Sequence, residues 1–597
     1  MSWPERPRSA VNILGIHYGH NATVCLIQDG RVTFCQSEER LNRIKNSVGF
    51  PTQTLQYLHR HHLPPEAIDR AIAFQRSPSL FRVLKKAQFV PYGGGYMLTP
   101  QDLRTTWKDA LYQTEAGWAF KQAKDRFRER RRNQDRDMLA WLAESLRMDP
   151  ARVECLDHHL AHAYSAVPNV QAWGETLVFT LDAEGDGKCA TVNLFAGGRM
   201  RVLSVADSRH SLGHYYSLTT ALLGMRGSEH EFKVMGMAPY ARRRYYENIL
   251  EQLGRLLQVD SDGAWRSRSW FTPLARRLHA LYDCQRFDNI AGAIQELTEN
   301  LTVHWIRHWI DRTGCRRIAL AGGVFMNVKA CQRIAALADV EKVFVVPSAG
   351  DETTALGAAV WGHLRHAGGQ TLEPLRDLYL GMAFSDADAE KAFEETRAAE
   401  RYEISQPANI NRTVAELLAA NTIVARCSGR AEFGARALGN RSILANAADF
   451  TNVSTINEAI KSRDFWMPFT PSILEEDMGR YVRNHERIFA PYMCITFDSL
   501  PIAQRDLRAA IHPRDFTVRP QCVVRDWNPD YHELISTFKE LTGQGGILNT
   551  SFNLHGEPNV CSPQDAIHTL DNSGLTHLAL GGFLLRKRAG ATGDVAC

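Results

Sequence analysis

The sequence has no Cys-x-x-Cys pair, no long apolar run and little net charge. Its 12 cysteines are scattered from Cys25 to Cys597, which excludes a zinc ribbon and a disulfide framework, so we expect reduced thiols. No apolar run reaches the roughly 18 residues of a membrane span, and the short run 11–16 is no signal peptide. The formal charge of +4 is small for 597 residues and argues against nucleic acid or a membrane as partner. We therefore expect a cytoplasmic protein.

The length exceeds what one hydrophobic core supports, so we expect two or more domains. Hydrophobic content of 44% and charged content of 23% are ordinary for a globular protein. The composition changes near residues 366–370 (HAGGQ), which predicts a linker and two domains, 1–368 and 369–597. The sequence leaves the oligomeric state open, and a homodimer is compatible with it.

Two stretches share an order of strand, glycine-containing turn and strand. Residues 11–16 and 23–27 flank the first turn, and Asp29-Gly30 predicts a further hairpin after them. Residues 176–181 and 190–194 repeat the pattern around an acidic turn. Two such hairpins are what a duplicated actin-like fold requires. Each turn suits a phosphate or a metal, or is only a tight hairpin.

His158 and His162 stand four residues apart in DHHLAHAYSA. On a helix this spacing places two imidazoles on one face, which suits two ligands of one metal ion, although an ordinary amphipathic helix shows the same spacing. Asp351 follows the strand 344–347 and supplies a carboxylate; an aspartate there is also a natural helix N-cap. With Asp182 as fourth ligand, the set suits Fe(II), Mn or Zn with open positions.

Gly322 and Gly323 follow the apolar strand 318–321 and precede Asn327. A strand that leads into two glycines at a helix N-terminus predicts an approach site for a nucleotide or a phosphate. Lys233 lies in EHEFKVMGMAPY and has the reach for an anionic group, although a lone lysine is usually exposed to solvent.

The C-terminal part carries many cations in turns rich in glycine and serine. Arginine offers paired donors to phosphate and lysine offers a point charge, so the pattern favours anion binding over structural ion pairs. The candidate residues for a phosphate-bearing substrate and a nucleotide triphosphate are Arg436, Lys461, Arg463, Arg519, Asn549 and Ser551.

Residues from about 80 to 134 form a predicted insertion that contains a basic helix over 121–132. Acidic residues are interspersed in this helix, which favours a plain surface helix over one that binds RNA.

The ordered motifs resemble the O-carbamoyltransferase family of antibiotic and nodulation-factor biosynthesis, and they run from Gly19 to Pro563. The matching strings are GHNA, EERLNRIK, HHLAHAYSA, LDAEGDG, EHEFKVMGMAPY, AGGVFMN, AGDETTALGAA, GRAEFGARALGNRSIL, PFTPSIL and LNTSFNLHGEPNVCSP.

The resemblance implies an α/β protein with two domains. The first would be an actin-like domain of the ASKHA superfamily (two ribonuclease-H-like halves), and the second a YrdC-like domain that makes carbamoyl-adenylate from carbamoyl phosphate and ATP with Mg²⁺. The first domain would then transfer the carbamoyl group at a metal site, usually iron.

His20 and Lys45 fall on positions near the carbamoyl-adenylate, and His20 is our candidate for the base that deprotonates the acceptor hydroxyl. Met467 stands where we expect an arginine, so Arg463 or Arg441 would have to replace it.

We therefore expect an ATP-dependent O-carbamoyltransferase that acts on a hydroxyl of a sugar or another secondary metabolite. A tRNA threonylcarbamoyladenosine-type enzyme, a non-catalytic ASKHA nucleotide-binding protein and a sugar kinase are the alternatives. The first predicts salt-sensitive tRNA binding, the second has no use for the two histidines and Asp351, and the third predicts ADP instead of AMP. Acceptor specificity is expected in the loops of 80–134 and 241–290.

Overall fold

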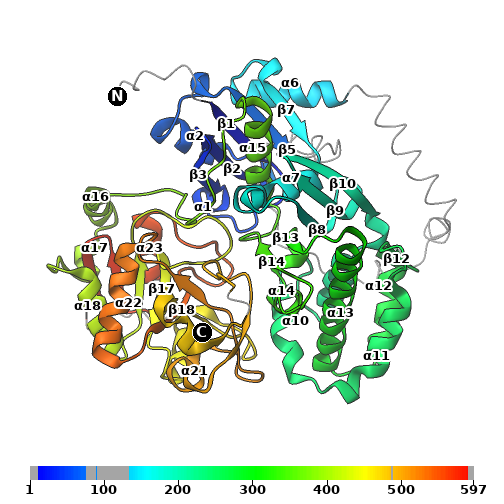
Figure 1. Ribbon diagram of the computed structural model, residues 1–597. Helices are drawn as coiled ribbons and strands as arrows, with labels where there is room; N and C mark the ends of the chain where they lie inside the picture. The colour runs from blue at the N-terminus through cyan, green and yellow to red at the C-terminus, as the bar shows by residue number, and fades with distance from the viewer. Residues whose placement is uncertain (1–10, 75–88, 91–133, 270, 486–487, 589–597) are drawn as a thin grey trace. The chain divides into compact units, whose positions relative to one another are not determined.

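The computed structural model describes residues 11–74, 89–90, 134–269, 271–485 and 488–588 (Figure 1). The chain divides into two compact units: unit 1 is Met1–Glu38 with Asn46–Leu375, and unit 2 is Glu39–Lys45 with Arg376–Cys597. The short segment Glu39–Lys45 thus belongs to the unit that the C-terminal part mainly forms. The insertion and basic helix predicted between 80 and 134 lie almost wholly outside the described residues, and the roles predicted for 1–368 and 369–597 stay predictions.

Unit 1 contains two five-stranded sheets that have the same topology. In each one, three antiparallel strands that follow one another in sequence are extended by two parallel strands. Across the first sheet the strands are β3 (Arg31–Ser37), β2 (Thr23–Gln28), β1 (Asn12–His17), β5 (Arg70–Phe74) and β7 (Val153–Leu156). Across the second they are β10 (Arg199–Asp207), β9 (Lys188–Ala196), β8 (Thr176–Gly185), β13 (Arg317–Ala321) and β14 (Lys342–Val345). The predicted hairpins are confirmed in both sheets.

The turns of these hairpins follow from their residues. Asp29 and Gly30 have φ of 51° and 81°, and Asp186 and Gly187 have φ of 51° and 77°. Two successive residues with positive φ form the tight turn that matches the twist of antiparallel strands, and aspartate followed by glycine tolerates it best. The second hairpin differs from the prediction in that β8 extends through the acidic residues to Gly185, with a register irregularity after Leu181.

Helix α15 (Thr353–His366) packs against β1 and β5 of the first sheet and against helix α7 (His158–Ser165). Glycine permits both close approaches. A Cβ atom on Gly357 would lie 1.7 Å from the carbonyl oxygen of Ala161 in α7, and one on Gly15 would lie 1.9 Å from the carbonyl oxygen of Ala355. The small residues Ala161 and Ala355, both completely buried, complete this contact. The sequence therefore fixes α7 closely beside α15 and its preceding loop.

The remaining helices of unit 1 are mainly amphipathic and cover the sheets. These remaining helices are α2 (Thr52–His61), α6 (Gln134–Leu146), α8 (Val167–Val170), α9 (Leu212–Leu222), α10 (Glu231–Met237), α11 (Arg243–Leu256), α12 (Phe271–Tyr282), α13 (Phe287–Thr313) and α14 (Val328–Ala335). Helix α13 packs against α11, and the two run side by side in Figure 1. Within the described residues, no helix is both long enough and apolar enough to cross a membrane, and no disulfide is formed.

Unit 2 is organised around one mixed eight-stranded sheet. Its strands, in order across the sheet, are β15 (Tyr402–Ser405), β25 (Phe583–Lys587), β24 (His577–Leu580), β16 (Val424–Cys427), β17 (Arg441–Ala445), β23 (Gly546–Ser551), β18 (Thr470–Leu474) and β22 (Gln521–Val523). Helices α18 (Ile410–Ala419) and α22 (Pro529–Thr542) pack together and bury Leu418, Leu534 and Phe538 against it. Helices α16 (Asp386–Thr396) and α23 (Pro563–Asp571) both begin with a serine capping box.

Candidate functional site

The first candidate site is built on α7. Asp157 caps this helix, because its side chain accepts a hydrogen bond of 3.2 Å from the Leu160 backbone N–H. Lys188 of β9 donates to the other Asp157 oxygen. The backbone N–H of His158 donates to Asp186 Oδ2 at 3.0 Å, so His158 is the first residue of a helix that is held at both its cap and its first N–H.

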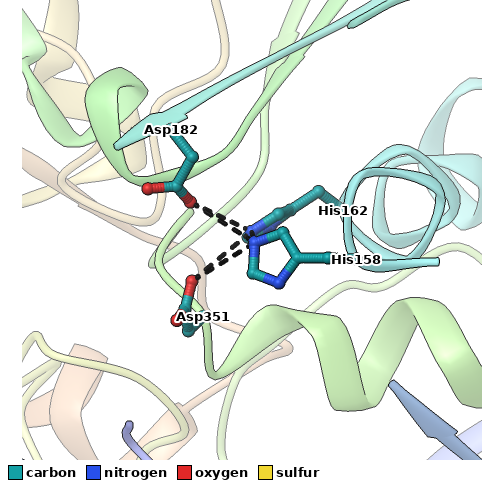
Figure 2. A group of neighbouring side chains, drawn as sticks. All are labelled: His158, His162, Asp182 and Asp351. Atoms are coloured by element: carbon teal, nitrogen blue, oxygen red, sulfur yellow. Dashed lines mark hydrogen bonds and ion pairs between the residues drawn. The ribbon is translucent and has the colours of Figure 1, made fainter. Parts of the chain in front are cut away.

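Four side chains converge at this end of α7 (Figure 2). The Nε2 atoms of His158 and His162 are 3.1 Å apart. Asp182 Oδ2 lies 3.2 Å from His162 Nε2 and 3.8 Å from His158 Nε2, whereas Asp351 Oδ1 lies 3.6 Å and 3.7 Å from the same two atoms. Their ligand atoms all lie within 4.8 Å of one another. These four residues come from three distant parts of the sequence and are neighbours in the structure.

The charges in this cluster, which we call the His–Asp cluster, compensate one another. Burial alone would lower the pKa of His162, but hydrogen bonds to Asp182 and Asp351 and their negative charges raise it to about 9. Burial likewise acts to raise the pKa of Asp182, but hydrogen bonds to His158 and His162 hold it well below its usual range. The pKa of Asp351 is lowered against the same effect of burial. The set thus pairs two nitrogen ligands with two carboxylates, a donor set that suits a divalent cation.

The structure contradicts the alternative that Asp351 is only the N-cap of helix α15. The helix begins at Thr353, its N-cap is Glu352, and the Glu352 side chain makes no capping hydrogen bond. Asp351 precedes the cap by one residue, so its carboxylate is left to face the two imidazoles (Figure 2). The Ser348 hydroxyl donates to the buried Glu352 carboxylate, which holds the loop before the helix.

Residues around the cluster hold its members in place. The Asp182 carboxylate accepts hydrogen bonds from the backbone N–H groups of Ala183 and Gly323, at 2.6 and 3.2 Å. Thr353 Oγ1 lies 3.4 Å from His162 Nδ1, the ring nitrogen that faces away from the aspartates. Such contacts fix the orientation of a ligand and its tautomer. Gly323 is thus placed beside the His–Asp cluster, which the sequence did not predict.

His17 is a further residue that sequence reasoning missed. Its ring is completely buried, stacks on Phe74 at 3.8 Å between centroids, and lies 2.6 Å from both Thr354 Oγ1 and the His20 carbonyl oxygen. Burial lowers the pKa of His17 to about 3, so it is neutral. His17 therefore links the turn that carries His20 to Thr354, which lies in the first turn of helix α15 just after Asp351.

The residues predicted to approach a nucleotide in unit 1 have three different local environments: a strand crossing, a helix N-cap and a helix that packs on α13. Gly322 has φ of 96°, and a Cβ atom there would lie 2.5 Å from the Leu181 carbonyl oxygen, so glycine is required at this crossing. The side chain of Asn327 caps α14 and exchanges hydrogen bonds with Gln295. Lys233 lies in α10, which packs against α13.

The second candidate site lies in unit 2 at the end of β23. Lys461 ends a π-helix over Asn457–Lys461, a geometry often found at functional sites. Its Nζ donates to the Ser551 carbonyl oxygen, to Ser551 Oγ at 3.2 Å and to Asn553 Oδ1 at 2.8 Å. Arg463 Nη2 donates to Thr550 Oγ1 at 3.1 Å. Lys461 and Ser551, both predicted, are therefore in direct contact.

Like charges gather around this contact. Burial, followed by the charges of Arg463 and Lys45, lowers the pKa of Lys461 well below its usual range. Burial and the charge of Arg436 lower the pKa of Arg463 to about 10, and burial with Arg436 and Arg463 lowers that of Arg519. We call these five residues the cation cluster: Lys45, Arg436, Lys461, Arg463 and Arg519. Crowded cations in a buried position favour an anion.

Two residues considered for anion binding make buried contacts within unit 2. The Asn549 amide donates to Ser472 Oγ at 2.9 Å and to the Ala437 carbonyl oxygen at 3.1 Å inside the sheet. The buried Arg441 guanidinium donates to backbone carbonyls, among them those of Ser428 and Cys561 at 2.7 and 3.1 Å. Arg463 therefore belongs to the cation cluster, whereas the Arg441 guanidinium binds backbone carbonyl groups.

Comparison with known proteins matches both parts of the chain. Residues 12–360 match the family model for the carbamoyltransferase N-terminus, and residues 415–587 match that for the carbamoyltransferase C-terminus. The chain is 31% identical over 584 residues to nodulation protein NolNO of Sinorhizobium fredii, and this alignment covers 96% of the chain and 80% of that protein. It is 33% identical over 445 residues to nodulation protein NolO of Bradyrhizobium diazoefficiens, covering 74% and 80%. It is also 30% identical over 272 residues to a 3'-hydroxymethylcephem-O-carbamoyltransferase of Amycolatopsis lactamdurans, covering 45% and 49%.

Proposed function

The chain belongs to the carbamoyltransferase family and is a carbamoyltransferase, and we propose that it is ATP-dependent and acts on a hydroxyl group. Carbamoyl phosphate, water and ATP would give carbamoyl-adenylate in unit 2, with release of phosphate and pyrophosphate. The carbamoyl group would then pass to a hydroxyl of a sugar or another secondary metabolite, with release of AMP. The observation that carries this proposal is the presence of two chemically different clusters, one in each unit.

Two finer assignments of fold belong to the proposal. The shared topology of the two sheets in unit 1 supports an actin-like domain of the ASKHA superfamily with two ribonuclease-H-like halves. For unit 2 we propose a YrdC-like domain, because its mixed sheet presents a cationic group at the end of β23. These assignments make unit 2 the adenylate-forming part and unit 1 the transferring part.

In unit 2 the cation cluster would bind the phosphates. Arginine donates paired N–H groups to phosphate oxygens, and Lys461 adds a point charge that is already held by Ser551 and Asn553. Water would first release phosphate from carbamoyl phosphate and leave carbamate. Attack of a carbamate oxygen on the α-phosphorus of ATP then forms carbamoyl-adenylate and spreads negative charge over the pyrophosphate that leaves. Fixed cations that need no rearrangement stabilise this charge. Mg²⁺ would accompany ATP, as with most triphosphates.

In unit 1 the residues of the His–Asp cluster fit a divalent cation. Their donor atoms are two imidazole nitrogens and two carboxylate oxygens within 4.8 Å of one another, and the buried histidines have their Nε2 atoms face to face. His158, His162, Asp182 and Asp351 would hold the cation, and Fe²⁺ is our first choice ahead of Zn²⁺ or Mn²⁺. When bound, the cation polarises a carbonyl group and stabilises the negative charge that develops on its oxygen.

The proton of the acceptor hydroxyl needs a base, and His20 is our candidate. Its backbone carbonyl oxygen is 2.6 Å from the His17 ring, which fixes the turn that carries it. We further propose that Gly322 and Gly323 allow the adenosine or phosphate part of the adenylate to approach the backbone, with Lys233 and Asn327 on neighbouring helices. Lys45 belongs to unit 2 and would contribute charge to the cation cluster there.

One experiment tests the proposed reaction. The protein is incubated with carbamoyl phosphate, ATP, Mg²⁺ and Fe(II), and pyrophosphate and AMP are measured with and without a panel of hydroxyl compounds. We expect carbamoyl-phosphate-dependent release of pyrophosphate, and a carbamoylated product by mass spectrometry with the right acceptor. ADP as product, or no pyrophosphate at all, would contradict the proposal.

A further inference from the structure

The segment Glu39–Lys45 belongs to unit 2, although the residues before and after it belong to unit 1, and hydrogen bonds hold these flanking residues close together. The backbone N–H of Glu38 donates to the Ala22 carbonyl oxygen at 2.8 Å, and the Ala22 N–H donates to the Ser47 carbonyl oxygen at 3.2 Å. The buried Glu38 carboxylate also accepts hydrogen bonds from the backbone N–H groups of Gln53 and Thr54, at 3.0 and 2.8 Å. Both ends of the segment are thus fixed in unit 1, while the segment itself belongs to unit 2. We call this segment the strap.

Arg43 of the strap holds a loop of unit 2. Its Nη1 donates to the Asn559 carbonyl oxygen at 2.7 Å, and its Nη2 donates to the Pro558 carbonyl oxygen at 2.9 Å. The guanidinium also lies 3.5 Å from the carboxylates of Glu557 and Asp565. Arg43 has φ of 60°, a left-handed conformation that is unfavourable for a residue with a side chain. The surrounding contacts over-determine this conformation.

The loop that Arg43 holds is joined directly to the cation cluster. The Asn553 amide donates to the Glu557 carbonyl oxygen at 2.9 Å, one residue before the carbonyl groups that Arg43 binds. Asn553 Oδ1 in turn accepts from Lys461 Nζ at 2.8 Å and from Ser551 Oγ at 2.7 Å. A continuous path therefore runs from Arg43 through the loop to Asn553 and then to Lys461.

Arg40 makes a second connection of the same kind. Its side chain is buried, and its Nη2 donates to the Gly434 carbonyl oxygen at 2.8 Å. Gly434 has φ of 95° and stands two residues before Arg436. The strap thus contacts the loop that Asn553 binds and the segment that carries Arg436, and it also carries Lys45 itself.

We propose that the strap is a positioning element of the anion site in unit 2, with Arg43 orienting Asn553, and through it Lys461 and Ser551, and Arg40 orienting the segment that carries Arg436. The proposal rests on the proposed function only for the identity of the anion. An arginine is required at position 43, because its fork binds two successive carbonyl groups at once, which one ammonium group does with poorer geometry.

The test compares Arg43→Ala, Arg43→Lys, Asn553→Ala and the double variant with the unaltered chain. Affinity for pyrophosphate is measured by calorimetry, and KM for carbamoyl phosphate is measured separately from kcat. Arg412→Ala is the control, because Arg412 is an exposed arginine of unit 2 that pairs with Glu416 on the same helix. Thermal unfolding reports the stability of every variant.

We expect Arg43→Ala to weaken pyrophosphate binding about tenfold and to raise KM more than it lowers kcat. Arg43→Lys recovers part of the affinity, Arg412→Ala has no effect, and Arg43→Ala adds little once Asn553 is alanine, since both changes act on the same path. If Arg43→Ala does not fold, Arg43→Lys alone must still weaken binding. Unchanged affinity in both Arg43 variants, or fully additive effects with Asn553→Ala, overturns the proposal.

The outcomes separate the strap from the proposed function. A chain that binds pyrophosphate in an Arg43-dependent way but releases no pyrophosphate from ATP keeps the strap and loses the proposed reaction. A chain that forms carbamoyl-adenylate equally well with and without Arg43 does the reverse. A chain that binds no pyrophosphate overturns both, because there is then no anion site to position.

Discussion

The His–Asp cluster of unit 1 and the cation cluster of unit 2 both combine buried with half-buried side chains, but they balance their charges in opposite ways. In the first, carboxylates raise the pKa of His162 and the histidines lower those of Asp182 and Asp351. In the second, burial and like charges lower the pKa of Lys461, Arg463 and Arg519 together. Opposite charges stabilise one another in unit 1, whereas the cations of unit 2 destabilise one another until an anion binds.

This difference suggests different sources of stability for the two sites. The His–Asp cluster supplies its own counter-charges, so its geometry exists without a ligand and depends on the close packing of α7 on α15. The cation cluster depends on hydrogen bonds to neutral groups such as Ser551 and Asn553, and on loops that the strap holds. A change in one unit should therefore affect only the partial reaction of that unit.

The largest effect is expected from His162→Ala. Loss of an outer partner of a metal ligand costs about 10- to 100-fold in affinity or activity, so loss of the ligand itself should lower carbamoyl transfer by at least about a hundredfold. Bound metal, measured by mass spectrometry of the elements, should fall in parallel. Pyrophosphate release by unit 2 should stay within about twofold.

His279→Ala is the matched control for this change, because His279 is an exposed histidine of helix α12. It should retain metal and activity. Equal loss of pyrophosphate release and of transfer in His162→Ala would show that the two clusters are not separable.

The next largest effect concerns ligand stabilisation of the cation cluster. Pyrophosphate at about a hundred times its Kd adds about 2.7 kcal/mol to the free energy of unfolding, which corresponds to roughly 5–10 °C in the Tm of a unit of this size. Lys461→Met should lose most of this shift, and His162→Ala should keep it. Differential scanning calorimetry at constant ionic strength measures both; an equal shift with sodium chloride would mean that the effect is only screening.

The patterns that sequence reasoning could read were local. His158 and His162 lie within one helical turn, and each hairpin is marked by aspartate and glycine at its turn. Asp351 was noticed because its carboxylate follows shortly after a strand end, and only the alternative that it caps the next helix is wrong. Lys461 and Ser551 were found because cations beside glycine and serine form a compositional pattern.

The strap and the second layer of contacts left no such pattern. Arg43 binds backbone carbonyl groups more than 500 residues away, and any residue type supplies a carbonyl group. His17 meets Thr354 at a separation of 337 residues, so its burial could not be read from its neighbours. The Asn549 amide, which we predict to bind an anion, donates to Ser472 and Ala437 inside the sheet, and its neighbours in sequence do not reveal these contacts. Tertiary packing decides these cases.

A smaller effect is expected from Gly357→Ala, which tests the dependence of the His–Asp cluster on packing. The added Cβ atom would meet the Ala161 carbonyl oxygen at 1.7 Å, between His158 and His162, so α7 and α15 must separate. Overpacking of this kind costs about 1–3 kcal/mol, and metal affinity should fall with it. Gly254→Ala in α11 is the control: nothing lies within 4 Å of the added atom, and alanine should stabilise that helix by up to about 1 kcal/mol. Denaturant unfolding measures both, and a neutral Gly357→Ala would contradict the packing argument.

The smallest effect is a pH dependence of anion affinity in unit 2, for which sulfate is the probe because it does not titrate near neutral pH. Burial, Arg463 and Lys45 lower the pKa of free Lys461, and a bound anion raises it again. Between these two values sulfate binding takes up a proton, so affinity falls by up to about tenfold per unit as pH rises, and it is constant below the lower value. Calorimetry in buffers of different ionisation enthalpy should detect the proton. Lys461→Met should bind more weakly with a flat profile, because the arginines stay charged. A flat profile in the unaltered chain would mean that Lys461 remains charged despite its neighbours, and the cation cluster would then hold its charges as firmly as the His–Asp cluster does.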